Sequence, residues 1–320
     1  MNSSHPRTFR HAVRGNAATI VILELLTFQS LLSTCFAQGS LTPPGAPAPA
    51  MKSLAQVEPR VPISSAPFTV SSAGSYYLTT NVTVSGGDAI TIAASGVTLD
   101  LNGFTISSSA AVGTGTGIKL NDGIRNIAVF NGHILSGVTN NSGSFSGGGF
   151  AQGVSSGNSS VNVRVSSLSV SGVLTYGILL NQGESTMVEN CTVRTVGGSY
   201  GIVASSVRNC VALDCAGTAI QGGQVMDCRG ESVEPSNGDG VHAQIAVNCL
   251  GFSQRFYGVF ATRTATGCFG QSASGTGLHA ENAAFCVGYR PGGIAIEATV
   301  ANGCYAENGG TAITNKYNMP

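Results

Sequence analysis

The chain has 320 residues, with 15 Lys+Arg and 15 Asp+Glu, and only 9% of its residues are charged. Binding to nucleic acid needs clustered Lys and Arg side chains, and no such cluster follows Arg14, so nucleic acid is not an expected partner. The 44 Gly residues alternate with recurring Val and Ile, so the chain can bury a core and is not a disordered low-complexity sequence.

The N-terminus has the pattern of a secretory signal peptide. Arg7, Arg10 and Arg14 precede the apolar run 17–32, and Cys35-Phe36-Ala37 supplies small residues for a cut after Ala37. The chain is therefore expected to be exported to the periplasm, the cell surface or the medium, with residues 1–37 as the signal segment. An uncleaved membrane anchor is the alternative, but the run is short for a bilayer, and no later segment predicts an integral membrane span.

The segment that follows is predicted to connect the signal to the folded domain. Residues 38–66 contain the stretch LTPPGAPAPA, typical of an extended tether, and a short helix is expected at 51–58 before Pro59. Residues 67–320 are predicted to form the repeat domain. The expected short strands 68–70 and 76–78 would form a small N-terminal cap over its first coil.

A repeat begins at residue 89. In each unit a small residue precedes an aliphatic one, which we call the marker. The intervals between successive markers are irregular at first and settle near eighteen residues. The pairs are Ala89-Ile90, Gly117-Ile118, Gly153-Val154, Gly177-Ile178, Gly201-Ile202, Ala219-Ile220, Gly240-Val241, Gly258-Val259, Gly277-Leu278, Ala295-Ile296 and Ala312-Ile313.

A second periodic set runs in step with the first. From Ile202 onward each cysteine lies eight residues after its marker, except Cys268, which lies nine after. The set contains Cys191, Cys210, Cys228, Cys249, Cys268, Cys286 and Cys304. Units of this length are too short for two helices, and their Gly, Val, Thr, Ser and Asn content disfavours helix. The sequence therefore predicts an all-β, right-handed parallel β-helix (a solenoid) of about eleven coils, with the hand set by the crossover rule.

The cysteine row is expected to be structural. Cβ atoms on adjacent rungs lie about 4.8 Å apart, beyond the roughly 3.5–4.5 Å that a disulfide needs. A straight file of sulfurs also does not surround a tetrahedral metal ion. We expect free, buried thiols, and neither a metal site nor a cofactor site is predicted.

The residue after each late marker should point outward, because side chains alternate along a strand. Successive coils then present one exposed row that suits an extended polysaccharide and marks the candidate binding residues. They are Gln221, His242, Phe260, His279 and Glu297, with Glu281 beside them on the same face. His279 with Glu281 could alternatively act as a general base pair or bind a divalent metal ion. A merely solvated face is the third interpretation.

One long insertion stands out among the early coils. Residues 136–153 read SGVTNNSGSFSGGGFAQG and are expected to protrude as a flexible loop, either walling a groove or as a tolerated insertion.

Several stretches resemble a known family. They are PPGAPAPAMKSLAQVEPRVPI, GSYYLTTNVTV, DAITIAASGVTLDLNGFTI and the Asn-Cys coils that end in ITNKYNMP. Together they resemble an exported bacterial family of right-handed parallel β-helix repeat proteins in the pectate-lyase-like superfamily. The resemblance implies the same fold and no known activity. The superfamily's polygalacturonase signatures (Asn-Thr-Asp, Asp-Asp, Gly-His-Gly and Arg-Ile-Lys) do not occur in this sequence, so no catalytic residue is predicted.

Three functions are therefore open. Binding or scaffolding of extracellular polysaccharide is favoured. A polysaccharide lyase or glycoside hydrolase requires a carboxylate cluster or an Arg with a metal site. A purely structural surface or adhesion module requires neither.

Overall fold

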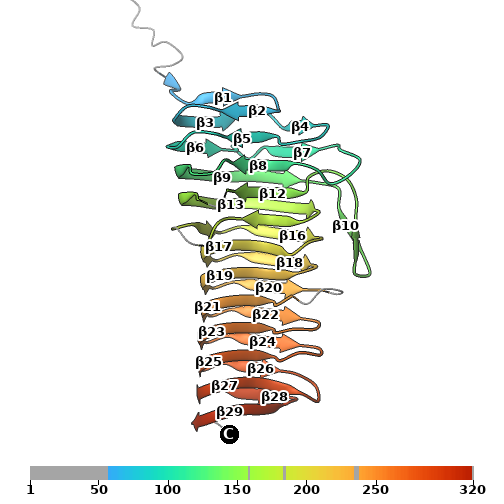
Figure 1. The fold of residues 1–320 in the computed structure, drawn as a ribbon, viewed down its shortest axis with the longest axis vertical. Coiled ribbons are helices and arrows are strands. Elements are labelled where there is room, and N and C mark those ends of the chain that lie inside the picture. Colours follow the sequence, from blue (N-terminus) through green and yellow to red (C-terminus); the bar gives the residue numbers. More distant parts are fainter. Residues whose placement is uncertain (1–56, 158, 183–184, 234–237, 319–320) are drawn as a thin grey trace, which may run out of the picture. The chain divides into compact units, whose positions relative to one another are not determined.

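The computed structural model describes residues 57–157, 159–182, 185–233 and 238–318. Residues 58–320 form one compact unit. The predicted signal segment and residues 38–56 of the predicted tether fall outside the described residues, whereas residues 57–66 are described and include a strand at Val61–Ile63. Within the described residues of this unit every element is a strand, and 27 of the strands form one parallel sheet wound into a β-helix of about eleven turns (Figure 1). The predicted fold class is confirmed.

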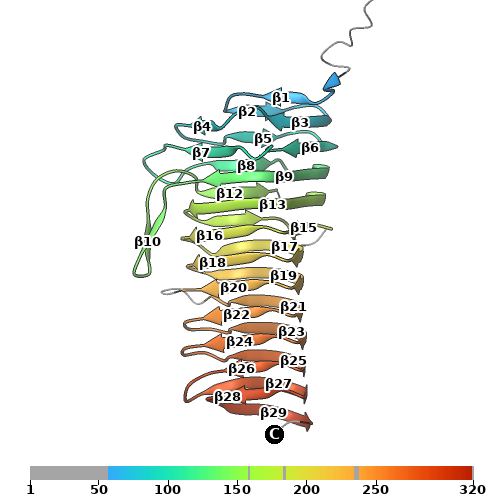
Figure 2. The same ribbon diagram turned by 180° about the vertical axis from the view of Figure 1, so that it is seen from behind.

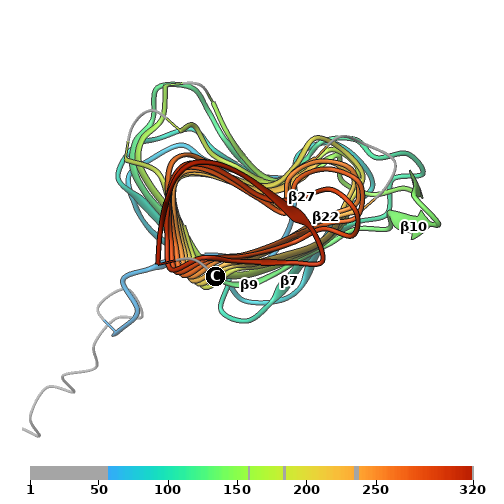
Figure 3. The ribbon, with the colours of Figure 1, turned by 90° about the horizontal axis from the view of Figure 1, so that it is seen from below.

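Each coil passes through three faces, which give the solenoid a three-sided outline when it is seen along its length (Figure 3). Face 1 carries the markers. It contains β2 (Phe68–Val70), β5 (Ile90–Ile92), β8 (Thr116–Leu120), β12 (Gln152–Ser156), β14 (Tyr176–Leu179) and the first parts of β17 (Tyr200–Arg208), β19 (Thr218–Met226), β21 (Val241–Val247), β23 (Val259–Thr266), β25 (Leu278–Ala284), β27 (Ile294–Asn302) and β29 (Gly310–Tyr317).

Face 2 follows face 1 in the later coils, where one bent strand supplies both. It contains β1 (Val61–Ile63), β3 (Gly74–Leu78), β6 (Val97–Asp100), the first parts of β9 (Arg125–Leu135) and β13 (Val161–Val173), and β15 (Met187–Glu189). In the later coils it contains the second parts of β17, β19, β21, β23, β25, β27 and β29.

Face 3 closes each coil. It contains β4 (Val82–Val84), β7 (Thr105–Ser108), the second parts of β9 and β13, then β16 (Thr192–Val196), β18 (Val211–Cys215), β20 (Arg229–Ser232), β22 (Leu250–Ser253), β24 (Phe269–Ser272), β26 (Val287–Tyr289) and β28 (Tyr305–Glu307).

The marker residues stack in register through the core. The parallel pairing links Ile90 to Ile118 and continues through each later marker to Ile296, and these side chains are fully buried. The last predicted marker is wrong by two residues. Thr311, not Ile313, pairs with Ile296, and Ile313 pairs with Ala298. A shift of two keeps the same side chains inward, so alternation alone did not fix this register.

The seven cysteines of the periodic set line one interior corner, between face 2 and face 3, whereas Cys215 lies at the other end of face 3, as the last residue of β18. Successive coils are joined there by backbone bonds such as Val211 N to Cys191 O at 3.0 Å, and all eight described cysteines are buried and free. The residue before each ladder cysteine has a positive φ, as in Asn209 (48°) and Asn248 (53°). Asn and Gly tolerate this conformation better than other residues, which explains the recurrent Asn-Cys pairs.

Strands form near the two N-terminal positions where the sequence predicts them. Strands β2 and β3 form at 68–70 and 74–78, where they make up the first coil, and β1 pairs with β3 from Val61 to Ile63 as the outermost strand. The sheet therefore begins a few residues before the boundary at residue 67 that the sequence pattern suggested.

The insertion at 136–153 is not a simple flexible loop. It contains an antiparallel hairpin, β10 (Thr139–Asn141) and β11 (Ser144–Ser146), which lies beside the coils of β16 and β18 (Figures 1 and 2). The hairpin adds a wall to one corner of the solenoid.

Candidate functional site

The predicted outward row lies in register on face 1. Gln221 pairs with His242, which pairs with Phe260, His279 and Glu297 in turn, and all five side chains are partly exposed. We call this row the stripe. Glu281 is exposed beside it, two residues after His279.

The centre of the stripe is a short pile of rings. The His242 and Phe260 ring centroids lie 4.7 Å apart, and Phe260 and His279 lie 4.8 Å apart with only 12° between their planes. Tyr257, in the turn before β23, contacts both Phe260 (4.8 Å) and His279 (5.4 Å). The four rings form one aromatic surface that crosses three coils.

A buried carboxylate orients the first imidazole. Asp239 Oδ2 lies 2.8 Å from His242 Nδ1, and the Asp239 side chain is only 7% exposed. Its other oxygen accepts the backbone N–H of Tyr257 at 3.1 Å. Because Nδ1 is held in this way, Nε2 is the nitrogen left to meet a ligand. Asp239 is not among the candidate residues predicted from the sequence.

The second imidazole has a different partner from the one expected. His279 Nδ1 lies 3.2 Å from Glu297 Oε2, without the geometry of a hydrogen bond, and Glu281 makes no ion pair among the described residues. The candidate His279–Glu281 base pair is therefore replaced by His279–Glu297, the next rung of the stripe.

Burial, followed by the nearby charges of Glu297 and Asp239, raises the pKa of the Tyr257 hydroxyl.

A β-bulge interrupts the register within this site. Ala243 pairs with Ala261 and Ile245 pairs with Thr264, so that β23 has two residues, Thr262 and Arg263, where β21 has one. The pairing with β25 shows the same extra residue. The bulge explains why Cys268 follows its marker by nine residues and not eight. It turns Arg263 outward, and Arg263 forms no ion pair with any described residue.

Two hollows lie along the stripe and meet at Thr262. The first, of about 320 Å³, is lined by Gln182, Gln221, Gly222, His242, Ala243, Gln244, Thr262 and Arg263. The second, of about 450 Å³, is lined by Thr262, His279, Ala280, Glu281, Glu297, Ala298, Thr299, Ala312, Ile313 and Thr314. The stripe thus offers amides and a guanidinium at one end, and carboxylates and hydroxyls at the other.

The cysteine row offers no comparable chemistry. Burial raises the pKa of the Cys215 thiol far above its ordinary range, and the hydrogen bond with Cys249, followed by burial, raises that of Cys268 to about 12. Thiols with raised pKa values stay protonated and inert. In the same row, the hydrogen bond with Cys210 lowers the pKa of the Cys191 thiol, which is buried. Among the described residues, no group of three or more His, Cys, Asp or Glu side chains is placed to hold a metal ion.

Comparison with known proteins finds no relative of this chain. No family model matches the chain, and neither a curated protein nor a solved structure matches it. The described part of the chain contains no helix with the length and apolar character needed to span a bilayer. The β-helix is thus established by the structure, and the resemblance to the pectate-lyase-like superfamily depends on the sequence stretches alone.

Proposed function

We propose that this chain is an exported β-helix protein that binds an extended extracellular polysaccharide along the stripe. The observation that carries the proposal is the pile of His242, Phe260 and His279 rings, at centroid distances of 4.7 and 4.8 Å, with a polar hollow at each end. Because each Phe260 face is covered by an imidazole, the ring edges form the outer apolar surface, which suits the C–H groups of a sugar, and the amides, hydroxyls and charges around them suit sugar hydroxyls.

The repeat of the solenoid supports a polymer over a small compact ligand. Coils recur about every 4.8 Å, so successive outward side chains form a regular ladder that a chain of repeating units can follow. Neither hollow is bounded by one coil alone, since their linings span β19 to β29. A ligand that contacts both ends of the stripe must lie along the solenoid axis.

A binding experiment with matched variants tests the proposal. The purified chain is screened on a glycan array, and affinity for the retained polysaccharides is measured with Phe260→Ala and His279→Ala. Each variant should lose about tenfold or more in affinity, about 1.4 kcal/mol. Phe269→Ala is the control, because Phe269 is a similarly half-buried ring on face 3 of the same coil, and it should bind like the wild type. Retention of no glycan, or an equal loss in the control, would instead favour a purely structural role.

A second candidate function is polysaccharide cleavage, and the Asp239–His242 pair favours it. A carboxylate that fixes one imidazole nitrogen leaves the other as a general base, and Arg263 in the same hollow could bind a developing anion. Release of reducing ends by the wild-type chain, lost in His242→Ala and reduced in Asp239→Asn, would support cleavage. Binding without release of reducing ends in any retained polysaccharide would exclude it for those polymers.

A further inference from the structure

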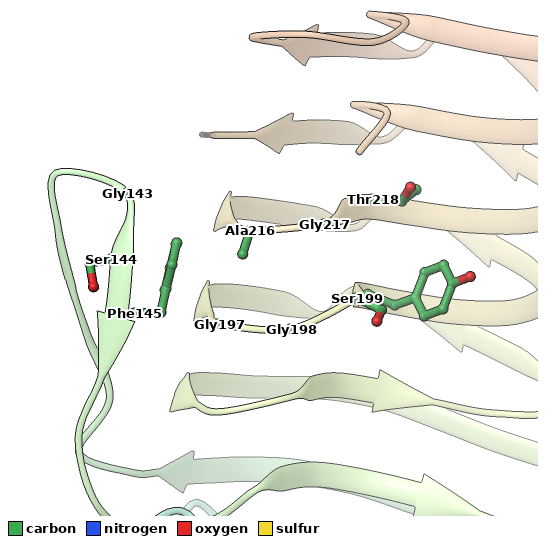
Figure 4. Close-up of a pocket in the computed structure, with 10 residues that line it drawn as sticks. Gly143, Ser144, Phe145, Gly197, Gly198, Ser199, Ala216, Gly217 and Thr218 are labelled. Atoms are coloured by element: carbon green, nitrogen blue, oxygen red, sulfur yellow. The ribbon is translucent and has the colours of Figure 1, made fainter. Parts of the chain in front are cut away.

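A separate hollow lies away from the stripe, beneath the β10–β11 hairpin. Its volume is about 610 Å³, and it separates the hairpin from the corner where face 3 turns into face 1 (Figure 4). It is lined by Gly143, Ser144, Phe145, Gly197, Gly198, Ser199, Tyr200, Ala216, Gly217 and Thr218. Volumes of this size are typical of small-ligand sites.

The hairpin is fastened to the solenoid by one side-chain network. The Asn140 amide donates to Asp214 Oδ1 at 2.6 Å, and the Thr195 hydroxyl donates to Asp214 Oδ2 at 2.8 Å. Asn140 Oδ1 also accepts the backbone N–H of Gly143 at 2.7 Å, which closes the hairpin's own turn. The same residue therefore shapes the hairpin and fixes its place, so that the wall of the hollow is held in position without a ligand.

The wall is an aromatic ring and the floor is bare backbone. The Phe145 side chain lies in the gap between the hairpin and the corner (Figure 4), and a Cβ on Gly197 would lie only 2.8 Å from Phe145 Cβ. A Cβ on Gly217 would lie 2.1 Å from the Ser199 carbonyl oxygen. Side chains cannot be added to this floor without moving the backbone, which keeps the space beside Phe145 open.

The remaining lining groups are hydroxyls. Ser199, Tyr200 and Thr218 supply them, whereas the Ser144 side chain lies on the side of β11 away from Phe145 (Figure 4), and no Asp, Glu, Lys, Arg or His side chain lines the hollow. An aromatic wall with hydroxyls and accessible peptide groups suits a neutral ring that carries several hydroxyl groups of its own. A charged ligand would find no counter-charge among the lining residues.

We propose that the hairpin hollow is a second carbohydrate site, and that it takes a neutral pyranose residue. The choice of a sugar rests on the proposed function of the stripe, whereas the preference for a neutral one comes from the lining of the hollow itself. The two sites border the same face. Thr218 lies three residues before Gln221 on β19, and its hydroxyl accepts the backbone N–H of Asp239 at 3.2 Å. One polysaccharide can therefore contact both.

A single tryptophan can report on this site, because the chain contains none. In Phe145→Trp the aromatic wall is kept and the emission comes from one position. Titration with neutral hexasaccharides of glucose, galactose and mannose should shift this emission for at least one of them. Affinity should stay constant between about pH 5.5 and 8, because no Asp, Glu, His, Lys or Arg side chain lines the hollow. No emission change with any of the three would overturn the inference.

Matched variants separate this inference from the proposed function. Phe145→Ala should weaken binding of the responsive sugar about tenfold, and Ser146→Ala, an exposed hairpin position outside the hollow, should not. Asn140→Ala keeps the ring but removes its anchor, and should weaken binding even if Phe145→Ala unfolds. A loss in Phe260→Ala with none in Phe145→Ala and Asn140→Ala overturns the hairpin site and leaves the stripe standing. The reverse pattern supports the hairpin site and counts against the stripe.

Discussion

A glycine-to-alanine substitution in the late coils tests how tightly the interior is packed. Gly251 lies in an inward row of face 3, in register with Gly230, Gly270 and Gly288. A Cβ at position 251 would lie 1.9 Å from the carbonyl oxygen of Gly258, whereas ordinary contact begins at 3.4 Å. The carbonyl must therefore retreat by the difference, 3.4 − 1.9 = 1.5 Å.

That movement has a calculable consequence. The same carbonyl accepts the backbone N–H of Val241 at 3.0 Å, and Val241 is fully buried. Overpacking costs about 1–3 kcal/mol, and a buried N–H without a partner costs about 1–3 kcal/mol more. We expect Gly251→Ala to destabilise the solenoid by about 2–6 kcal/mol.

The control is Gly86→Ala on the surface. Its nearest neighbour would be the Thr114 hydroxyl at 3.9 Å, and its φ is not in the left-handed region, so its stability should change by less than about 0.5 kcal/mol. Urea denaturation followed by circular dichroism compares the midpoints of both variants with that of the wild type. Because solenoids can unfold in stages, the same wavelength must be used throughout. Equal midpoints for the two variants would refute the narrow interior.

Three further outcomes are expected. Ellman's reagent should react slowly with the native chain and titrate at least eight thiols after unfolding, since the eight described cysteines are buried and free; no thiols in the unfolded chain would contradict this. Phe285→Asn should raise the melting temperature by roughly 2–4 °C, which corresponds to about 1 kcal/mol of stability, because Phe285 holds φ 54° at a corner where Asn is tolerated. A lowered melting temperature would show that the contacts of the Phe285 ring stabilise the fold by more than its backbone conformation costs. In Glu297→Gln the pKa of Tyr257, followed by the absorbance difference from Tyr257→Phe, should fall toward its ordinary value because one nearby negative charge is gone; no fall would remove Glu297 as a cause.

The sequence was sufficient for the architecture because the interior is strictly periodic. Markers such as Ile220 and Val241 recur at one position per coil, and each must be small enough and apolar enough to stack on the next. The same periodicity located the cysteine corner and the outward row. Where two registers place the same side chains inward, as at Ile313, the pattern carried no information and the prediction failed.

The chemistry of the site was harder to predict from the sequence than the architecture, because it depends on residues in the turns between the faces. Asp239 and Tyr257 lie just before their strands, in segments that read as turns, and only the backbone path brings them to His242 and His279. The hairpin's position was likewise invisible, since Asn140 and its partner Asp214 are 74 residues apart. The sequence signal for the bulge within the site was the nine-residue interval before Cys268.

The nine-residue interval marks the coil that has one residue more than the core packing requires. The interior rows are in register on both sides of the bulge, with Ala261 facing Ala243 and Ala265 facing Ala246. The extra residue therefore fills no space in the core, and its effect is confined to the outer surface, where it turns Arg263 into the hollow beside His242. Bulges of this kind re-aim a side chain at the cost of a local break in the ladder. The coil that carries the bulge also carries Phe260, the central ring of the stripe, and so this break in the register coincides with the middle of the proposed binding surface.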